Sequence, residues 1–227
     1  PDVVPPADTT VAPNTPAAEL IDYEPGPMAM RRLTRGQYVT TVRAIFGDDV
    51  EVLVTTEVDL PLEGLHSVGA SVTSVTPAGI ERYELAARLI ASHALSPERR
   101  GDWITCAPAS EGAADDSCAE AFVEALAPRV LRRALHEGER AVYVSLARSA
   151  AEGLGGFYQG LEAVLSAWLL TPDFLFIQER AQPGDEALLG HRLTGETLAS
   201  RLSYFLWNQG PDSALMDASA TAGSSSG

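Results

Sequence analysis

Signals that begin and end α-helices recur along this chain, and they constrain its fold more than any other feature of the sequence. The clearest lies at Leu33–Gln37, where the Thr34 hydroxyl and the Gln37 side chain have the spacing of a capping box. A helix is therefore predicted to begin there and to end at Gly47. The apolar face of this helix would be formed by Tyr38, Val42, Ile45 and Phe46.

Hydroxyl residues followed by proline predict the next two helices. Thr76 is expected to be an N-cap, because Pro77 follows it and proline is favoured in the first turn of a helix. The buried stripe predicted for this helix consists of Ile80, Tyr83, Ala87, Ile90 and Ala94. Ser96, also followed by proline, is expected to begin a short helix ahead of Trp103.

Two more helices are predicted in the middle of the chain. Ser117 is expected to cap the first, and Pro128 is expected to bend or end it. Leu135–Glu139 opens the second, with His136 in a capping position. The apolar positions expected to be buried in these two helices are Phe122, Leu126, Val142, Leu146 and Ala150.

The last third of the chain contains the most apolar helix candidate. Residues 160–170 predict a central buried helix, Thr171-Pro172 breaks it, and Phe174–Phe176 continue as another apolar turn. Leu193–Glu196 opens a further helix, and a last one is predicted over 213–220. The apolar residues expected on the helix after Leu193 are Leu198, Leu202, Phe205 and Leu206.

The remaining segments lack helical periodicity. Residues 1–27 are rich in Pro, Ala and Thr and are expected to form a disordered arm. Residues 28–75 should hold the first capped helix and then irregular, extended segments or a short hairpin. Residues 76–220 should form a helical bundle with a connector at 184–190, and residues 221–227 a flexible tail.

The predicted fold class is therefore mainly α. We expect a multi-helix orthogonal bundle with one irregular or short β excursion near residues 48–75 and a disordered N-terminal arm.

Composition excludes some partners. The chain has 31 acidic residues against 16 basic ones, which gives a net charge of -15 at pH 7. Because phosphate groups need a basic face, this balance argues against a nucleic-acid partner and against an anionic membrane surface. No apolar run approaches the roughly 20 residues of a membrane span, so no transmembrane segment is expected.

Two cysteines bear on the compartment. Cys106 and Cys118 lie twelve positions apart across a polar loop, a spacing that a disulfide can close. A structural disulfide is predicted, with a redox pair or two free thiols as the alternatives. Because disulfides persist in oxidising places, the prediction favours an extracytoplasmic location: the periplasm, the outer surface or the medium.

The sequence does not contain a recognisable catalytic, cofactor-binding or metal-binding motif. Catalytic residues are therefore left unknown, and neither cofactor nor metal is expected. The histidines do not show zinc-ligand spacing; they are His66, His93, His136 and His191. Carboxylates cluster at Glu57, Asp59, Glu63, Asp115 and Asp116. Catalysis by a carboxylate pair and calcium binding remain as alternatives to chance clustering.

Two further groups of residues are open to two interpretations. The pairs Arg31-Arg32 and Arg132-Arg133 favour ion pairing with the many acids over binding of an anion. Aromatic residues crowd the last third, where helical spacing favours core packing over an exposed platform for a sugar or a partner. These aromatic residues are Trp168, Phe174, Phe176, Tyr204, Phe205 and Trp207.

Four segments together resemble a known group of proteins. These segments are Arg31–Gly47, Cys118–Leu135, Thr171–Leu175 and Ala199–Asp212. In this order they resemble the N-terminal portion of uncharacterised multi-domain exported proteins of Planctomycetes and myxobacteria, which are often fused to c-type cytochrome modules. The resemblance covers most of residues 28–220 and implies that the chain is a fragment, a cleaved piece or a truncated paralogue. His136 and Ala134 depart from the group's pattern, and both changes bear on helix capping.

The sequence predicts an exported, disulfide-stapled helical scaffold or interaction module within a larger extracytoplasmic protein or assembly. A protein partner or the group's C-terminal domains would bind it, and a lipid anchor upstream of Pro1 is compatible with the arm. The alternative is part of an extracytoplasmic enzyme for polymer degradation or redox-linked chemistry, which the cytochrome association implies. A third alternative, a subunit of a surface assembly, would be marked by a broad exposed apolar patch.

Overall fold

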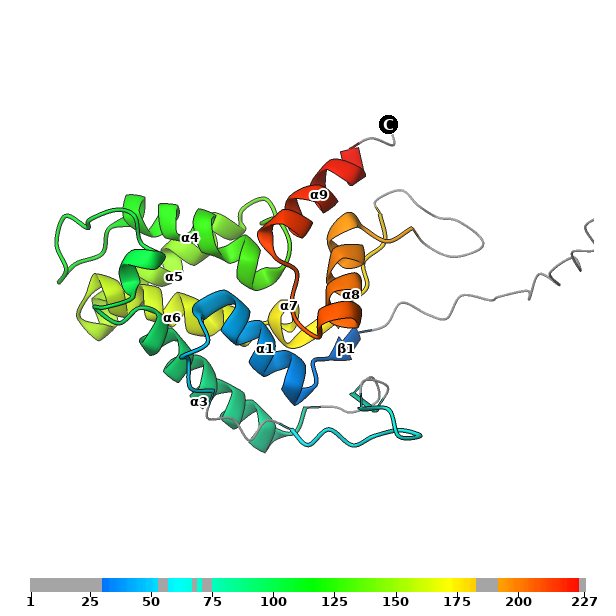
Figure 1. The fold of residues 1–227 in the computed structure, drawn as a ribbon. Helices are drawn as coiled ribbons and strands as arrows, with labels where there is room; N and C mark the ends of the chain where they lie inside the picture. The colour runs from blue at the N-terminus through cyan, green and yellow to red at the C-terminus, as the bar shows by residue number, and fades with distance from the viewer. Residues whose placement is uncertain (1–29, 53–56, 67–68, 71–74, 183–191, 225–227) are drawn as a thin grey trace, which may run out of the picture.

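Helices make up most of the part of the chain that the structure describes, as Figure 1 shows. The structure is a computed structural model, and it describes residues 30–52, 57–66, 69–70, 75–182 and 192–224. Within these ranges it contains eight α-helices, one 3-10 helix and two short strands. The prediction of a mainly α fold is confirmed.

Three predicted segments fall wholly or partly outside the described residues. The arm predicted at 1–27 and the connector at 184–190 lie outside them. The tail predicted at 221–227 lies partly outside them, since the last helix runs to Ser224. The division of the chain at residues 75 and 76 stays a prediction.

The strands are β1 (Met30–Arg32) and β2 (Phe176–Gln178), and the helices are α1 (Arg35–Phe46), α3 (Pro77–Ala94), η1 (Arg100–Asp102, 3-10), α4 (Asp116–Leu131), α5 (Glu139–Leu154), α6 (Phe157–Leu169), α7 (Pro172–Leu175), α8 (Gly195–Trp207) and α9 (Ser213–Ser224). Some helices are joined by short loops, such as the one between α5 and α6, whereas long segments separate α1 from α3 and α3 from α4. No helix in the described ranges is both long enough and apolar enough to cross a membrane.

The first helix begins as its capping box predicts. The Gln37 amide donates to Thr34 Oγ1 at 3.2 Å, and the Thr34 amide donates to Gln37 Oε1 at 3.0 Å. Gly47 ends α1 at φ 104°, a backbone conformation that favours glycine. Most of the predicted apolar face of α1 is buried, namely Tyr38, Val42 and Phe46, with Ile45 half-buried against the core.

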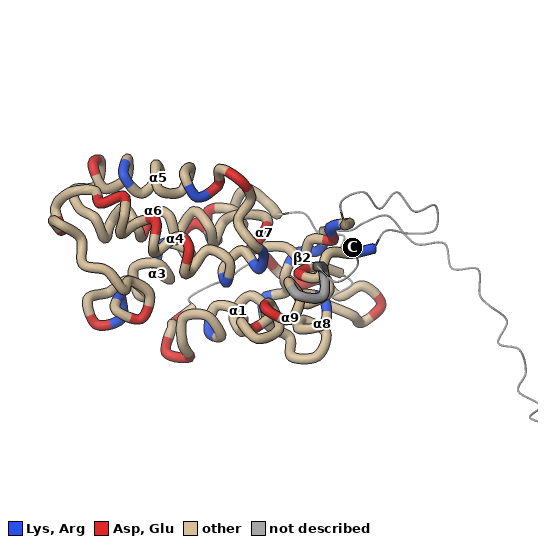
Figure 2. Tube along the Cα trace, turned by 90° about the horizontal axis from the view of Figure 1, so that it is seen from above, with Lys and Arg blue, Asp and Glu red and all other residues tan. Residues whose placement is uncertain are grey.

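Helix α6 lies at the centre of the bundle, as predicted, although it begins at Phe157 rather than at residue 160. Figures 1 and 2 show α6 running between α5 and α3. Trp168 on α6 is fully buried, stacks on Phe122 with 5.6 Å between ring centroids, and meets Tyr143 edge-on at 5.4 Å. These rings fill the space where three helices meet.

The described part of residues 48–75 fits the predicted irregular or short β excursion, with a bridge between Leu62 and Leu65 across a two-residue turn. The two-stranded antiparallel sheet lies elsewhere: it pairs β1 with β2 and places Arg31 opposite Ile177. Phe176 therefore begins a strand rather than continuing the turn of α7. The physical reason is that β1 and β2 satisfy each other's backbone groups, which no local pattern reveals.

Two predicted details of α4 are wrong. Its N-cap is Asp115, whose carboxylate accepts from the Cys118 amide at 3.0 Å, rather than Ser117. Pro128 does not end the helix, which continues to Leu131. A proline in the last turn removes only one amide donor, and Arg132 ends the helix in the left-handed conformation at φ 55°.

Helix α5 buries a different side from the predicted one. Val142 is 64% exposed and Leu146 is also exposed, whereas Ala147 and Ala151 are buried. The reason is close packing against α6: a Cβ added at Gly160 would lie 2.4 Å from the Ala147 carbonyl oxygen. Two helices can approach this closely only through small residues, so the larger apolar side chains of α5 lie outside.

The predicted stripe of α3 is correct except at its beginning. Thr76 caps the helix, and its hydroxyl accepts from the Gly79 amide at 3.0 Å. Ile80, in the first turn of the helix, is 57% exposed. The residues of the predicted stripe that are buried are Tyr83, Ala87, Ile90 and Ala94.

Candidate functional site

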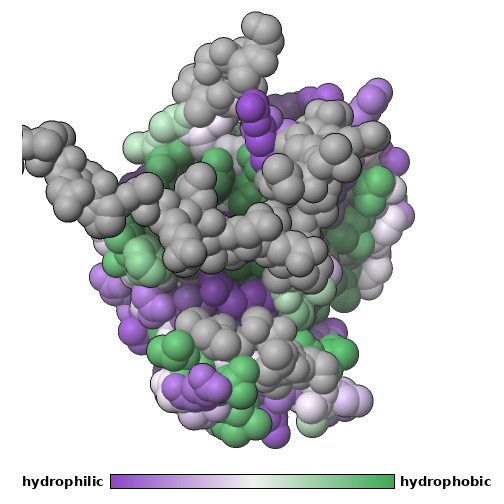
Figure 3. All heavy atoms as spheres, turned by 90° about the vertical axis from the view of Figure 1, so that its right-hand side faces the viewer, coloured by the Kyte–Doolittle hydropathy of each residue, from purple (hydrophilic) through white to green (hydrophobic). Residues whose placement is uncertain are grey.

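Helix α8 turns large apolar residues to solvent and smaller, mostly polar residues to the protein. Its buried side consists of Thr197, Ala199, Ser200, Ser203 and Tyr204. The exposed side, which we call the α8 apolar face, consists of Leu198, Leu202, Phe205 and Leu206. Trp207 at the end of the helix is also exposed, but its position on the helix is opposite to that of Leu198. Phe205 is 84% exposed and Trp207 is 58% exposed. Figure 3 turns this side of the molecule towards the reader and shows hydrophobic residues at the surface beside hydrophilic ones.

The core packing predicted for the aromatic residues is therefore only partly correct. Trp168, Phe174 and Tyr204 are buried, and Phe176 is half-buried. Phe205 and Trp207 are exposed, together with the leucines predicted to be on the same side of the helix.

Tyr204 is the residue that orients α8. Its hydroxyl lies 3.1 Å from Thr41 Oγ1 and accepts from Arg132 Nη1 at 3.0 Å. Arg132 also donates to the carbonyl oxygens of Phe174 at 3.1 Å and of Phe176 at 2.8 Å. These bonds draw the polar side of α8 inward, so its apolar side must face away.

Two arginines lie beside the α8 apolar face. Arg201 forms an ion pair with Glu179 at 3.1 Å, and Arg31 interacts with both of these charged groups. Burial and repulsion by Arg201 lower the pKa of Arg31, and the Glu179 carboxylate opposes this effect. Arg31 Nε is buried and has no hydrogen-bond partner among the described residues. This edge of the molecule is therefore locally basic on a strongly acidic protein.

A cleft of about 720 Å³ opens between α1, α4, α9 and the loop after α4. This is within the range of small-molecule sites. Most of its polar groups already have roles in the fold. The Glu196 carboxylate accepts from the Ala134 amide at 3.2 Å, and Asp212 caps α9 through the Leu215 amide at 2.8 Å. The Arg129 guanidinium lies over the Trp103 ring, 5.3 Å from its centroid.

At the edge of the cleft, Arg133 belongs to an ion-pair network that stabilises the fold. Arg133 donates to both oxygens of Glu139, at 2.7 and 2.8 Å, and to Asp173 at 2.7 Å. The hydrogen bonds from Arg133 lower the pKa of Glu139 to about 2. Burial acts to raise the pKa of Asp173, but hydrogen bonds from Arg133 and Arg180 hold it below its usual value. Both acids therefore stay ionised at neutral pH, so neither can act as a general acid.

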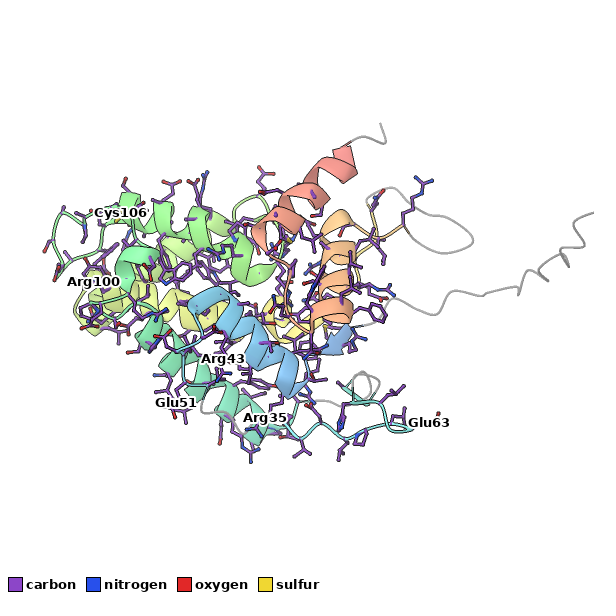
Figure 4. The ribbon with its side chains drawn as sticks, in the orientation of Figure 1. Arg35, Arg43, Glu51, Glu63, Arg100 and Cys106 are labelled. Atoms are coloured by element: carbon purple, nitrogen blue, oxygen red, sulfur yellow. A yellow bond between two sulfur atoms is a disulfide. The ribbon has the colours of Figure 1, made fainter. Side chains whose placement is uncertain are left out.

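The predicted disulfide is present between Cys106 and Cys118, whose Cα atoms lie 5.7 Å apart. It joins the loop after η1 to the first turn of α4. Figure 4 labels Cys106 at one end of the helical body, and α8 lies towards the other end. The disulfide therefore stabilises the end of the helical body where α4 begins. It is not part of the α8 apolar face.

The carboxylates singled out in the sequence do not converge on one site. Glu57 accepts from the Thr76 amide at 2.8 Å at the start of α3, and Asp59 pairs with Arg32 at 3.0 Å. Asp115 caps α4, whereas Asp116 forms an ion pair with Arg148 on α5. Glu63 occupies a turn in the left-handed conformation, at φ 49°. Four of these five carboxylates therefore have separate partners within the fold.

The predicted histidines are also dispersed. His66 Nδ1 lies 3.1 Å from the Asp59 carbonyl oxygen, and His93 lies in the last turn of α3 near Asp49. His136 does not cap α5, because Gly138 occupies the N-cap position. His191 lies outside the described residues. In the described ranges, groups of three His, Cys, Asp or Glu residues suited to a metal ion are not found.

Sequence reasoning missed Arg201 and the exposure of the α8 apolar face, and it identified Arg31 only as one of a pair of basic residues. The available signal was the spacing of Thr197, Ser200 and Ser203, three residues apart, which places a polar stripe opposite the apolar one. By itself this spacing cannot show which side is buried.

Three family models match the chain, each described as a protein of unknown function. PSD3 (DUF1587) matches residues 31–96, PSD5 (DUF1595) residues 118–179, and PSD4 (DUF1592) residues 193–224. Comparisons with curated proteins and with solved structures gave no match. The chain therefore carries, in the order PSD3, PSD5 and PSD4, segments that match three domains of unknown function.

Proposed function

We propose that this protein is a non-catalytic interaction module of a larger extracytoplasmic assembly, and that the α8 apolar face is its docking surface. The observation that carries the proposal is the orientation of α8, which exposes Leu198, Leu202 and Phe205 and buries a polar stripe. Contiguous apolar residues on the surface of a soluble protein mark interaction sites more often than chance.

The free energy that a partner would gain by covering the α8 apolar face supports a docking role. Complete burial of a large apolar side chain stabilises by about 1.5–3 kcal/mol, and four such residues lie on the α8 apolar face. Partial burial of these side chains by a partner would therefore contribute several kcal/mol, as aromatic anchors do at the centre of protein interfaces.

Two observations support the extracytoplasmic location and the absence of catalysis. The disulfide between Cys106 and Cys118 is of a kind that persists outside the cytoplasm. Several ionisable groups that line the cleft already serve capping and ion pairs, as Arg133, Arg140 and Asp212 illustrate. We therefore assign these groups a structural role rather than a catalytic one.

Site-specific photo-cross-linking in the source cells tests the docking surface. A photoreactive residue at Phe205 should cross-link the protein to a discrete partner. The same residue at Val142, which is also apolar and exposed but lies on α5, is the control. Equal or absent cross-linking at the two positions would refute the proposal. Alkylation of unreduced material tests the compartment: both thiols should resist the reagent until a reductant is added.

The second candidate is part of an extracytoplasmic enzyme acting on a polymer or coupled to a redox partner, and the cleft of about 720 Å³ is the observation that favours it. Its exposed polar residues include His136 and Glu137. Soluble oligosaccharides titrated into the protein should shift the amide resonances of these two residues if the cleft is an enzyme site. Unchanged resonances at saturating oligosaccharide concentration would exclude polymer binding there.

A further inference from the structure

We propose that the occupant of the α8 apolar face is an amphipathic α-helix that places a carboxylate against Arg31 and Arg201. This inference rests on the proposed function and adds to it the chemistry of the partner. It is argued from the spacing of the exposed residues, from the charges beside them and from the charge of the whole protein.

The spacing of the exposed residues fits a helix as the occupant. Leu198, Leu202 and Phe205 lie four and three residues apart, so they form one stripe along α8. At 1.5 Å of rise per residue the stripe from Leu198 to Phe205 is about 10 Å long, two turns of a helix. A straight apolar stripe of this length packs best against a matching stripe on a second helix.

The charge beside the stripe is basic. Arg201 lies three residues after Leu198 and four before Phe205, so it belongs to the same side of α8. It forms an ion pair with Glu179 at 3.1 Å, and the Arg31 guanidinium lies close enough to interact electrostatically with both of these groups. A second carboxylate at this position would offset the repulsion between the two guanidinium groups and could pair with Arg201, whose side chain is half exposed.

The charge of the whole protein argues against other occupants. A second copy would bring another net charge of -15 and an identical Arg31 and Arg201 pair to the same contact. An anionic lipid surface would meet the same overall repulsion. A helix with acidic residues beside its apolar stripe gains from the local arginines while its apolar residues cover Leu202 and Phe205.

The test uses two synthetic amphipathic peptides of about 18 residues with the same Leu and Phe stripe, long enough to form a helix on binding. One carries Glu beside the stripe and the other Lys. Each is titrated into the full chain, and isothermal titration calorimetry measures its affinity. The Glu peptide should bind about tenfold more tightly than the Lys peptide.

Variants assign the preference to the two arginines. Arg31→Gln and Arg201→Gln together should reduce the difference between the peptides to less than about twofold. Phe205→Ala should weaken the binding of both. Arg140→Gln is the matched control, because Arg140 is an exposed, ion-paired arginine on α5, remote from α8 in sequence. It should leave both affinities unchanged, and circular dichroism checks that each variant folds.

Three outcomes would overturn the inference. They are equal binding of the Glu and Lys peptides or binding of neither, a Phe205-dependent dimer seen by light scattering, and Phe205-dependent binding to phosphatidylglycerol vesicles. Each of these is compatible with cross-linking at Phe205 in cells. The partner chemistry can therefore fail while the docking surface stands, and the absence of cross-linking would remove both.

Discussion

At the scale of single residues, Arg132 shows how one guanidinium can join distant segments. Its side chain is buried and donates to the carbonyl oxygens of Asp173, Phe174 and Phe176 and to the Tyr204 hydroxyl. The planar group with five donors suits this arrangement, which a lysine ammonium could not reproduce.

We expect Arg132→Ala to lower the free energy of unfolding by about 3–5 kcal/mol, because it leaves several buried acceptors without donors. Urea unfolding followed by circular dichroism measures the change. The control Arg140→Ala removes a surface arginine and should cost less than about 1 kcal/mol. A cost for Arg132→Ala no larger than the control's would show that the guanidinium does not hold α8 in place.

Because the pKa of Glu139 is lowered in the folded state, we expect the free energy of unfolding to depend on pH. Its pKa is lowered from 4.5 to about 2 by hydrogen bonds from Arg133. A lowered carboxylate pKa contributes stability that is fully present above pH 4.5 and is lost as the pH falls through about 2. The difference in unfolding free energy between the native chain and Glu139→Gln should therefore shrink between these pH values, as urea unfolding at each pH would measure. A difference independent of pH would contradict the assignment.

At the scale of elements, packing partners decide which side of each helix is buried. Helix α5 buries alanines because Gly160 brings α6 close, and α8 buries polar residues because Tyr204 is drawn inward. Neither choice follows from the apolar residues of the helix itself.

Two glycine variants test this account of α5 and α6. Gly160→Ala should destabilise by about 1–3 kcal/mol, since the new methyl group would lie 2.4 Å from the Ala147 carbonyl oxygen. Gly153→Ala in α5 meets no atom within 4 Å and should stabilise by about 0.5–1 kcal/mol. Thermal unfolding measures both changes. If both variants were stabilising, the close contact of the two helices would be wrong.

At the scale of the whole molecule, the three matched segments share one body. Strand β1 belongs to the first match and pairs with β2 of the second, and Arg132 of the second binds Tyr204 of the third. Acidic and basic residues are interspersed over the helices in Figure 2. The parts that match separate family models are therefore held together by backbone pairing and by a buried arginine.

The disulfide, which lies at one end of the helical body, should stabilise the folded chain. Replacing Cys106 and Cys118 by serine should lower the free energy of unfolding by about 3 kcal/mol, according to the chain-entropy model for a loop of this length. Urea unfolding measures the change, and reduction of the native chain should reproduce it. Unchanged stability in both cases would show that the loop is ordered without the bond.

The sequence predicted well what depends on neighbouring residues. The capping box at Thr34, the caps at Thr76 and Thr194 and the stop at Gly47 were found because a cap is formed within one helical turn. The cysteine pair followed from its spacing. The cap of α4 was misplaced to Ser117 because Asp115 caps equally well and lies two residues away.

The sequence by itself determined that this chain forms capped helices, where most of them begin and end, and which cysteines can pair, because these properties depend on local geometry. Only the tertiary structure decided which side of α5 and α8 is buried and that Arg31 pairs with a strand far along the chain. An amphipathic helix offers two sides, and the choice between them depends on the shape and hydrogen bonds of its neighbours. That choice places Phe205 and Trp207 in solvent.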